Sequence, residues 1–282
     1  MRLANHDGRA VLLLADDKGA DVATASSGTF GPDLQPIYER WAEFQAWAQE
    51  SLPGLAPDVT IDRTLLGTPS PRPPQTIAIG LNYADHAAET GFEVPTNLPP
   101  VFAKWASSIT GPHGEVALPP GGDTDWEVEV VAVIGRTAHE ISPEAAWDHV
   151  AGLTVGQDLS ERVLQFVGQP PQFGLAKSYP KFSPTGPWLV TTDELPDRDD
   201  LALGCSIDGE VVQEGRTSKL HFSIPRSIAK LSEILTLLPG DVIFTGTPDG
   251  VGLGRHPQRF LQPGETLRTW VEGIGEMEHT FC

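Results

Sequence analysis

The feature of this sequence that most constrains its fold is the run from Asp125 to Gly135, which reads DWEVEVVAVIG. Valine, isoleucine and tryptophan dominate it and a glycine ends it, a composition that predicts a β-strand. Alternate side chains of a strand share a face, so Glu127 and Glu129 point the same way. Either they form the polar outer face of a half-exposed strand, or they bind a divalent cation that offsets their mutual repulsion.

The rest of the chain predicts a globular protein that binds neither nucleic acid nor a membrane. With 38 acidic against 19 basic residues, the formal net charge is −19, which disfavours contact with phosphate backbones or anionic lipid. No apolar run is long enough for a transmembrane helix, and the N-terminus lacks the apolar core of a signal peptide. Cys205 and Cys282 form no C-x-x-C pair and no disulfide framework, so we expect a cytoplasmic protein.

The pattern of elements predicts a small N-terminal module, residues 1–71, and a larger domain, residues 72–282, joined at the Pro-rich stretch 69–74. In the module we expect a β-hairpin at 11–14 and 20–25 and one amphipathic helix over about 33–51. In the larger domain we expect strands at 76–80, 101–104, 153–158 and 242–245, and helices at 82–91, 142–150 and 224–238. Strands outnumber helices without βαβ alternation, so the predicted fold class is α+β, mixed β with a few helices.

Several short motifs are found in addition to the strand that contains Glu127 and Glu129. Asp158 ends a predicted strand, His86 and Glu89 are spaced to meet on one face of a helix, and residues 246–252 form a glycine-rich loop. Together and in this order, these features resemble the fumarylacetoacetate hydrolase superfamily over about residues 76–254. The segments that carry the resemblance are GLNYADH at 80–86, DWEVE at 125–129, QDLSER at 157–162, AKS at 176–178 and FTGTPDGVG at 244–252.

This resemblance implies a metal-dependent enzyme that acts on small 2-oxo acids, with the family's mixed β-sandwich roll as its fold and a homodimer as its assembly. It implies Glu127, Glu129 and Asp158 as ligands of Mg²⁺ or Mn²⁺, with Ca²⁺ as a further candidate. Oxygen ligands suit these ions, and three carboxylates leave positions open for a 2-oxo acid. Taken alone, Asp158 is as well explained as a turn residue at the end of a strand.

The resemblance also implies roles around that ion. His86 and Glu89 match a catalytic pair in which Glu89 holds the imidazole and His86 takes a proton from water, on a segment expected to act as a mobile lid. The alternative for them is a surface pair near a helix end. Lys177 matches a lysine that stabilises an enolate, although an ordinary exposed lysine has the same spacing. Substrate contacts are implied for Lys104, Arg162, Gln165, Thr245, Gly246 and Thr247, and Arg162 has pairing with an acid as its alternative.

The chain departs from the family pattern in ways that bear on the substrate. Val163, Pro180 and the basic stretch Arg216–Lys219 differ from relatives, and the basic stretch predicts positive charge beside the pocket, suited to a more anionic substrate. The expected function is hydrolysis of a carbon–carbon bond in an acylpyruvate-like 2,4-dioxo acid, through activated water and a metal-stabilised enolate. The alternatives are an oxaloacetate-type decarboxylase or a 2-oxo/2-hydroxy-dienoate isomerase on the same scaffold, and a non-catalytic ligand-binding relative.

Overall fold

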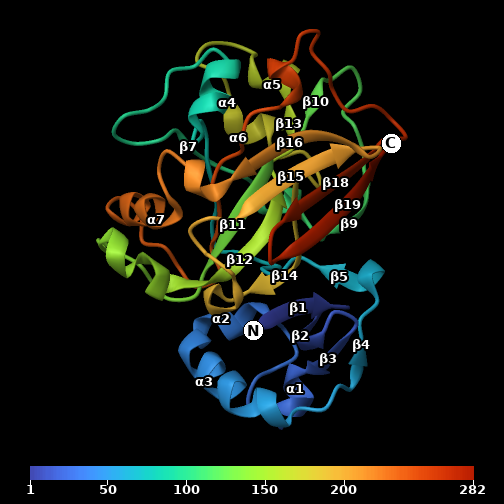
Figure 1. Ribbon diagram of the computed structural model, residues 1–282, viewed down its shortest axis with the longest axis vertical. Helices are drawn as coiled ribbons and strands as arrows, with labels where there is room; N and C mark the ends of the chain where they lie inside the picture. The colour runs from blue at the N-terminus through green and yellow to red at the C-terminus, as the bar shows by residue number, and fades with distance from the viewer.

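The computed structural model describes residues 1–282 and is organised around one large mixed sheet (Figure 1). Its strands are β1 (Arg2–His6), β2 (Arg9–Ala15), β3 (Lys18–Asp21), β4 (Val59–Thr60), β5 (Leu66–Gly67), β6 (Thr76–Ile79), β7 (Val101–Ala103), β8 (Ile109–Thr110), β11 (Val128–Ile134), β12 (Val150–Gln157), β14 (Ser183–Val190) and β17 (Val242–Phe244). Neighbours follow the order β4-β3-β2-β1-β14-β12-β11-β17-β6-β7, with β5 beside β1 and β8 beside β14. Within this sheet only the pairs β6–β17 and β8–β14 are parallel.

A second sheet packs across the first and makes the fold a sandwich. Its strands are β9 (His113–Val116), β15 (Ala202–Ile207), β16 (Glu210–Arg216), β18 (Thr266–Val271) and β19 (Gly275–Phe281). They pair in the order β16-β15-β18-β19-β9 and lie over β11 and β12 in Figure 1. A two-stranded ribbon, β10 (Thr124–Asp125) with β13 (Ser160–Glu161), stands at the end of the sandwich nearest the site described below.

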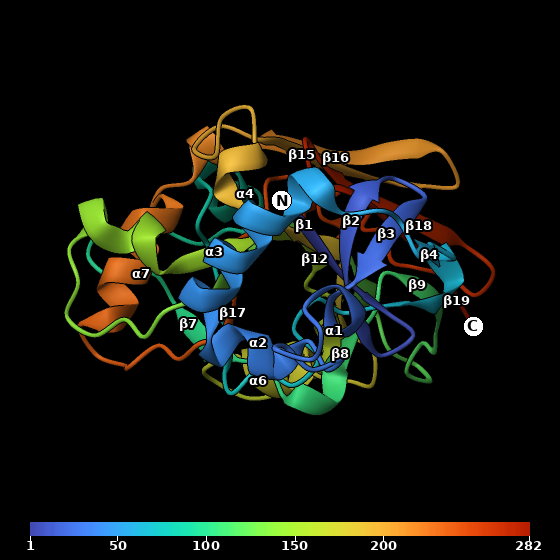
Figure 2. The ribbon, with the colours of Figure 1, turned by 90° about the horizontal axis from the view of Figure 1, so that it is seen from below.

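Seven short α-helices complete the fold, and none is long and apolar enough to span a bilayer. They are α1 (Val22–Ala25), α2 (Gln35–Glu39), α3 (Trp41–Ser51), α4 (Ala84–Glu89), α5 (Arg162–Gln165), α6 (Phe173–Ala176) and α7 (Ile224–Ser232). Seen from below, α2 and α3 form one side of the N-terminal part, and β1–β3 form the other (Figure 2). The helices therefore surround the sandwich and do not alternate with its strands.

Strand β11 is buried on both faces, which explains why its sequence is almost continuously apolar. Val128 and Val130 pack into the core shared by the two sheets, together with Leu203 of β15. Val131 and Val133 face the other way, into a second core that includes α2 and α3. Because Glu129 has the parity of Val131, its side chain points to the face opposite the second sheet.

The α+β class predicted from the sequence is confirmed, and several element boundaries are corrected. The expected hairpin forms as β2 and β3, but its second strand ends at Asp21, whose carboxylate caps α1 by accepting the N–H of Thr24. The single helix expected over 33–51 is two helices that meet at Arg40. The strand expected from Asp125 is interrupted at residues 126–127, so that β10 and β11 are separate elements.

Two further helix predictions are refined. The short helix expected over 142–150 is present as a 3₁₀-helix, Pro143–His149, with Ser142 before it. The helix expected over 224–238 ends at Ser232. Beyond that end Leu237 is fully buried, but Ile234 is 66% exposed and Leu238 is 38% exposed, so the helical spacing of buried residues does not continue.

The N-terminal part is continuous with the main sheet. Strand β1 pairs with β14 through Arg2–Val190 and Leu3–Leu189, and the Tyr38 hydroxyl donates a hydrogen bond of 2.8 Å to the carbonyl of Pro69. Its apolar side chains share a core with Val131 and Leu189. A boundary near residue 72 between two independent units stays a prediction.

Candidate active site

Three buried carboxylates meet at one end of β11. Glu129 belongs to β11, Glu127 lies in the break before it, and Asp158 follows directly after the neighbouring strand β12. The pairing of Val128 with Gln157 brings the strand ends together, and the N–H of Asp158 donates to the carbonyl of Glu127 at 2.9 Å. One ligand oxygen from each carboxylate lies within 4.8 Å of the others. The three acidic residues picked out by the sequence are therefore neighbours in space.

The charges of these carboxylates are only partly compensated by the chain. Glu129 accepts one hydrogen bond, from the N–H of Gly246 at 2.7 Å. Burial, followed by the negative charges of Asp158 and Glu127, raises the pKa of Glu129 well above its usual value. Burial also raises the pKa of Glu127, but the positive charges of Lys177, Arg162 and His86 outweigh it and leave that pKa below its usual range. Clustered hard oxygen donors with unmet negative charge fit a divalent cation such as Mg²⁺ or Mn²⁺.

Two buried lysines lie against the carboxylates. Lys177, just after α6, donates to Glu127 Oε2 at 2.6 Å and to Asp158 Oδ2 at 2.7 Å. Burial lowers the pKa of Lys177, but Asp158 and Glu127 outweigh this effect and the net pKa is raised. Lys104, after β7, donates to Asp158 and to the carbonyl of Lys177, and burial lowers its pKa. The side chain of Lys104 is 0% exposed and does not line the cleft, which disagrees with the substrate contact predicted for it.

His86 and Glu89 lie on α4, one turn apart, at the side of the same cleft. His86 Nδ1 and Glu89 Oε1 are 2.9 Å apart, and the other oxygen of Glu89 accepts the N–H of Gly250 at 2.9 Å. A carboxylate beside Nδ1 favours the tautomer that carries its proton there, which leaves Nε2 as a proton acceptor. His86 lines the cleft together with Glu127 and Glu129.

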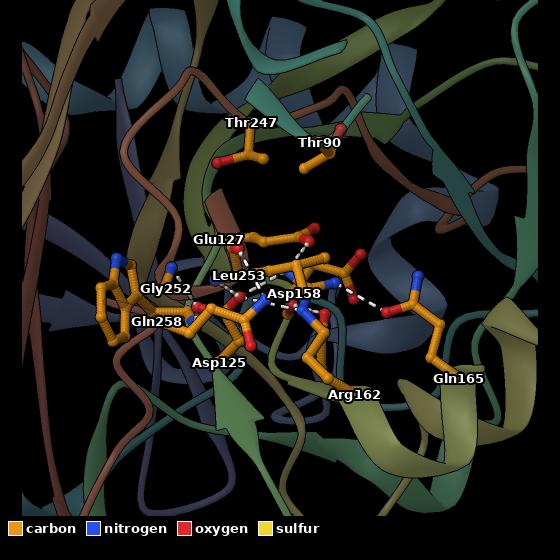
Figure 3. Close-up of polar contacts among 12 residues, drawn as sticks. Thr90, Asp125, Glu127, Asp158, Arg162, Gln165, Thr247, Gly252, Leu253 and Gln258 are labelled. Atoms are coloured by element: carbon orange, nitrogen blue, oxygen red, sulfur yellow. Dashed lines mark hydrogen bonds and ion pairs between the residues drawn. The ribbon is translucent and has the colours of Figure 1, made fainter. Parts of the chain in front are cut away.

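Arg162, the first residue of α5, connects this helix to the buried carboxylates (Figure 3). Its guanidinium donates to Asp125 Oδ2 at 2.9 Å, to Glu127 Oε1 at 2.8 Å and to Gln165 Oε1 at 2.8 Å. Arg162 therefore pairs with acidic residues, which was the alternative considered from the sequence, and it also lines the cleft. Gln165 lines the cleft as well, and its amide nitrogen makes no hydrogen bond within the chain.

Asp125 is the residue of this network that the sequence did not single out. It is fully buried and, besides Arg162, accepts the N–H groups of Gly252 at 2.7 Å and Leu253 at 2.9 Å. It thereby ties the glycine-rich loop to the strand that carries the glutamates. The only signal for it in the sequence was its place at the start of the motif DWEVE.

The glycine-rich loop does not present the carboxylate cradle that the sequence predicted. The hydroxyl of Thr245 donates to the carbonyl of Val130 at 2.8 Å, and the N–H of Gly246 is taken by Glu129. Only Thr247 of the three lines the cleft, where its hydroxyl accepts the side-chain amide of Gln213 at 2.8 Å. Thr245 and Gly246 are thus bonded to the strand and to one of its carboxylates, and the substrate contacts expected for them stay predictions.

The basic stretch expected beside the pocket lies elsewhere. Arg216 pairs with Asp200 at 2.7 Å and approaches Glu272 at 3.6 Å, and Lys219 is exposed in the following turn. Neither lines the cleft. The inference from this stretch to a more anionic substrate therefore has no support in the structure.

The cleft has a polar and an apolar part. Its polar lining is formed by His86, Glu127, Glu129, Arg162, Gln165 and Lys177. Apolar side chains form the larger part of the remaining wall, namely Ile79, Leu81, Phe92, Phe102, Phe173 and Leu253. Figure 3 shows Thr90 and Thr247 facing the acidic end from the opposite side. Phe92 and Thr90 come from the segment that follows α4, which the sequence predicted to be a lid.

Residues 75–282 match the family model described as fumarylacetoacetate (FAA) hydrolase, C-terminal. The chain belongs to the fumarylacetoacetate hydrolase family. The resemblance inferred from the five motifs is thereby confirmed. Among sequence relatives of this family, a protein of Burkholderia lata provisionally named a hydrolase is 49% identical over 207 residues, covering 72% of this chain and 73% of that protein.

Solved structures of the fumarylacetoacetate hydrolase family share the fold over the whole chain. A Mycobacterium smegmatis protein provisionally named HpcE has a TM-score of 0.93 at 53% identity, covering 100% of this chain and 99% of that chain. A probable 2-hydroxyhepta-2,4-diene-1,7-dioate isomerase of Mycobacterium abscessus gives 0.83 at 29% identity, covering 99% and 97%. Maleylpyruvate hydrolase of Sphingobium sp. SYK-6, solved with manganese(II) and pyruvate, gives 0.79 at 29% identity, covering 100% and 98%. The predicted family-type fold is confirmed, and these neighbours include both hydrolases and isomerases.

Proposed function

We propose that this protein is a metal-dependent hydrolase that cleaves a carbon–carbon bond in an acylpyruvate-like 2,4-dioxo acid. The observation that carries the proposal is that His86, paired with Glu89, lines the same cleft as Glu127 and Glu129, and that Asp158 lies beside these two carboxylates. A base poised for water beside a site for a divalent cation is the combination that hydrolysis of a β-diketone requires. The manganese and pyruvate in the Sphingobium maleylpyruvate hydrolase structure support the same assignment.

Glu127, Glu129 and Asp158 would hold Mg²⁺ or Mn²⁺, because their oxygens lie within 4.8 Å of one another and are buried. When bound, the ion supplies Lewis-acid polarisation of the oxygens of a 2-oxo acid and a positive charge at that end of the cleft. Lys177 donates to Glu127 at 2.6 Å and to Asp158 at 2.7 Å, and its positive charge helps to hold the pKa of Glu127 below its usual range. The free amide of Gln165 is placed to donate to the substrate.

The chemical step belongs to His86. Glu89 accepts a hydrogen bond from Nδ1–H of His86 and a second one from the N–H of Gly250, so the imidazole is fixed with Nε2 as its basic atom. Nε2 takes a proton from water, and the water oxygen forms a bond to the C4 carbonyl carbon of the substrate. The C3–C4 bond then breaks, its electron pair passes to the pyruvate part as an enolate, and the acyl part leaves as a carboxylic acid. The enolate is protonated at C3, which gives pyruvate and restores neutral His86.

Replacement of His86 by alanine tests this proposal. His86→Ala should lower the hydrolysis of acetylpyruvate by about a hundred-fold or more, since it removes the general base. The same variant should retain most of any decarboxylation of oxaloacetate, which needs the charge at the metal end but no activated water. Acetylpyruvate cleavage at the wild-type rate in His86→Ala would contradict the assignment.

The second candidate is an isomerase of 2-oxo or 2-hydroxy-dienoates, favoured by the likeness to the Mycobacterium abscessus isomerase at a TM-score of 0.83. Isomerisation moves a proton along one carbon skeleton and releases no acid. Analysis of the products by mass separates the two functions, because hydrolysis adds one water and divides the substrate. Metal binding without turnover of either substrate class would instead indicate the non-catalytic relative considered from the sequence.

We also propose that the protein is a homodimer that associates through the free edge of β7 and the adjoining α5 and α6. Residues 94–103 and 163–176 carry no charged side chain in a chain of net charge −19, and α6 packs against β7. Six of the eleven exposed large apolar side chains lie in these two segments, and a seventh, Trp105, follows the first: Leu98, Val101, Trp105, Val163, Phe166, Val167 and Leu175. An uncharged face allows two acidic copies to approach without repulsion, and an unpaired apolar edge strand favours such contact.

A further inference from the structure

We infer that the substrate carries an apolar group, not a second carboxylate, at the end remote from its 2-oxo acid. This inference rests on the proposed function, because it concerns the acyl part of the same 2,4-dioxo acid. It depends on two independent features of the cleft: the pairing of every basic group in its lining, and the composition of the wall beyond them.

Each basic side chain that lines the cleft already has an acidic partner. Lys177 donates to Glu127 and Asp158, and His86 is paired with Glu89. Arg162 uses its guanidinium on Asp125, Glu127 and Gln165. All three cations belong to the acidic end, where the 2-oxo acid is proposed to bind. No unpaired cation of the lining is left for a second carboxylate.

Two nearby arginines that do not line the cleft also have partners within the chain. Arg255 lies over the indole of Trp126 and donates to the carbonyl of Val212 at 2.9 Å. Arg259 stacks on the same indole and pairs with Glu265 at 3.0 Å. Both therefore hold the loop that follows Gly252, and neither lines the cleft.

The rest of the wall is mainly apolar and partly aromatic, with the hydroxyls of Thr90 and Thr247 as its polar side-chain groups. Phe102 and Phe173 pack with their rings tilted and their centroids 5.6 Å apart, and the Lys177 ammonium lies 5.3 Å from the Phe102 centroid. Phe92 and Leu253 line the same cleft from the lid segment and from the glycine-rich loop. All four side chains are half-buried, so apolar surface remains for a ligand to cover.

Paired basic groups together with an apolar wall favour an uncharged acyl group over one that carries a carboxylate. An alkyl or aryl acyl group would cover the exposed surface of Phe92, Phe173 and Leu253 and gain from leaving water. A carboxylate in the same position would lose its hydration without gaining an unpaired cation, which is costly. Differences of this kind commonly change kcat/KM by about ten-fold or more.

A matched pair of substrates tests the inference. 2,4-Dioxoheptanoate and 2,4-dioxoheptanedioate have the same seven-carbon chain and differ only in a terminal methyl or carboxylate. With the Mn²⁺-loaded protein, we expect kcat/KM to favour the monoacid by about ten-fold or more. Equal values, or a preference for the diacid, would overturn the inference while leaving the hydrolase proposal intact.

A binding measurement separates failure of the inference from failure of the proposed function. 2-Oxoheptanoate and 2-oxoheptanedioate lack the second keto group and cannot be cleaved, so calorimetry reports their affinity alone. Tighter binding of the monoacid without turnover of either dioxo acid would contradict the hydrolase and uphold the apolar acyl site. Tighter binding of the diacid would overturn the apolar acyl site whatever the turnover.

A charge placed in the wall should reverse the preference. Phe92→Arg offers a cation to a terminal carboxylate, and we expect the ratio of the two kcat/KM values to shift toward the diacid by about ten-fold or more. Val211→Arg is the matched control, because Val211 is 53% exposed on β16 and does not line the cleft. The control should leave the ratio unchanged. An unchanged ratio in folded Phe92→Arg would count against the inference.

Discussion

The carboxylate of Glu89 is held between two partners, His86 Nδ1 and the N–H of Gly250, each at 2.9 Å. A third neighbour limits its freedom, because a Cβ at Gly254 would lie only 2.7 Å from Glu89 Oε2. We expect Gly254→Ala to push the carboxylate away from His86 and to lower kcat for acetylpyruvate by about ten-fold, since a misplaced base costs rate. Steady-state kinetics and the melting temperature, measured together, check this expectation.

Gly54→Ala provides the matched control for that substitution. A Cβ at Gly54 would meet nothing within 4 Å, and its backbone does not adopt a positive φ. The control should keep full activity. Wild-type kcat in Gly254→Ala, or an equal loss in both variants, would contradict the positioning of Glu89 as described.

Single residues differed in how well the sequence predicted their places. Glu127 and Glu129 stood out as a possible cation site because strand periodicity is a local property, and the full set with Asp158 was implied by the resemblance to the family. The partners that Lys104 and Thr245 have in the structure could not be foreseen, because they depend on which distant segments meet them, and the substrate contacts expected for both stay predictions. Asp125 was missed for the same reason, since its bonds to Gly252 and Arg162 join residues 127 and 37 positions away.

At the scale of elements, strands were predicted better than helices. A strand such as β11 is indicated by a run of β-branched residues, and burial on both faces explains the run. The break at residues 126–127 has no such signal in the sequence, yet it separates β10 from β11 and contains Glu127. The apolar spacing of 224–238 extended beyond the real end of the helix at Ser232, because Leu237 is buried there through a β-bridge with Ala138 and not through a further helical turn.

His279, in strand β19, should make the free energy of unfolding depend on pH. Burial lowers the pKa of His279 to about 4, and the imidazole Nε2 lies 3.0 Å from the carbonyl of Gly111. An unfolded histidine titrates near about 6.5, so the unfolded chain binds the proton first as the pH falls. Neutral His279 makes its full contribution to the free energy of unfolding above about pH 6.5. This contribution is lost as the pH falls toward 4, which lowers the free energy of unfolding by about 3 kcal/mol.

His279→Gln removes the titration and keeps a donor for the carbonyl of Gly111. We expect the free energy of unfolding, measured with denaturant between pH 7 and pH 4, to fall less steeply in this variant than in the wild type. His139→Gln is the control, because His139 is exposed. Parallel pH profiles for His279→Gln and the wild type would show that His279 does not carry the effect.

At the scale of the whole molecule, the proposed dimer face makes a direct prediction. Trp105 is 51% exposed beside β7, so Trp105→Glu places a charge in an otherwise uncharged face. We expect the wild type to have the mass of a dimer by light scattering and Trp105→Glu to shift toward the monomer. Val211→Glu adds the same charge at a 53% exposed site on β16, in the second sheet, and should stay dimeric. A monomeric wild type would contradict the proposal.

The overall class of the fold followed from the sequence because strands outnumber helices and do not alternate with them. The arrangement of the N-terminal part did not follow, since its strands join the main sheet through β14, far along the chain. Motifs located the acidic end of the cleft. Its apolar wall is assembled from Phe92, Phe102, Phe173 and Leu253, which no motif connects.

The most direct test of the central claim is a product analysis of acetylpyruvate with protein stripped of metal and then reloaded with Mn²⁺ or Mg²⁺. Metal-dependent hydrolysis predicts acetate and pyruvate in equal amounts from the reloaded protein and a loss of both after stripping. Equal cleavage by the stripped protein would contradict the metal site at Glu127, Glu129 and Asp158. A rearranged product with no acetate would contradict hydrolysis itself and favour the isomerase.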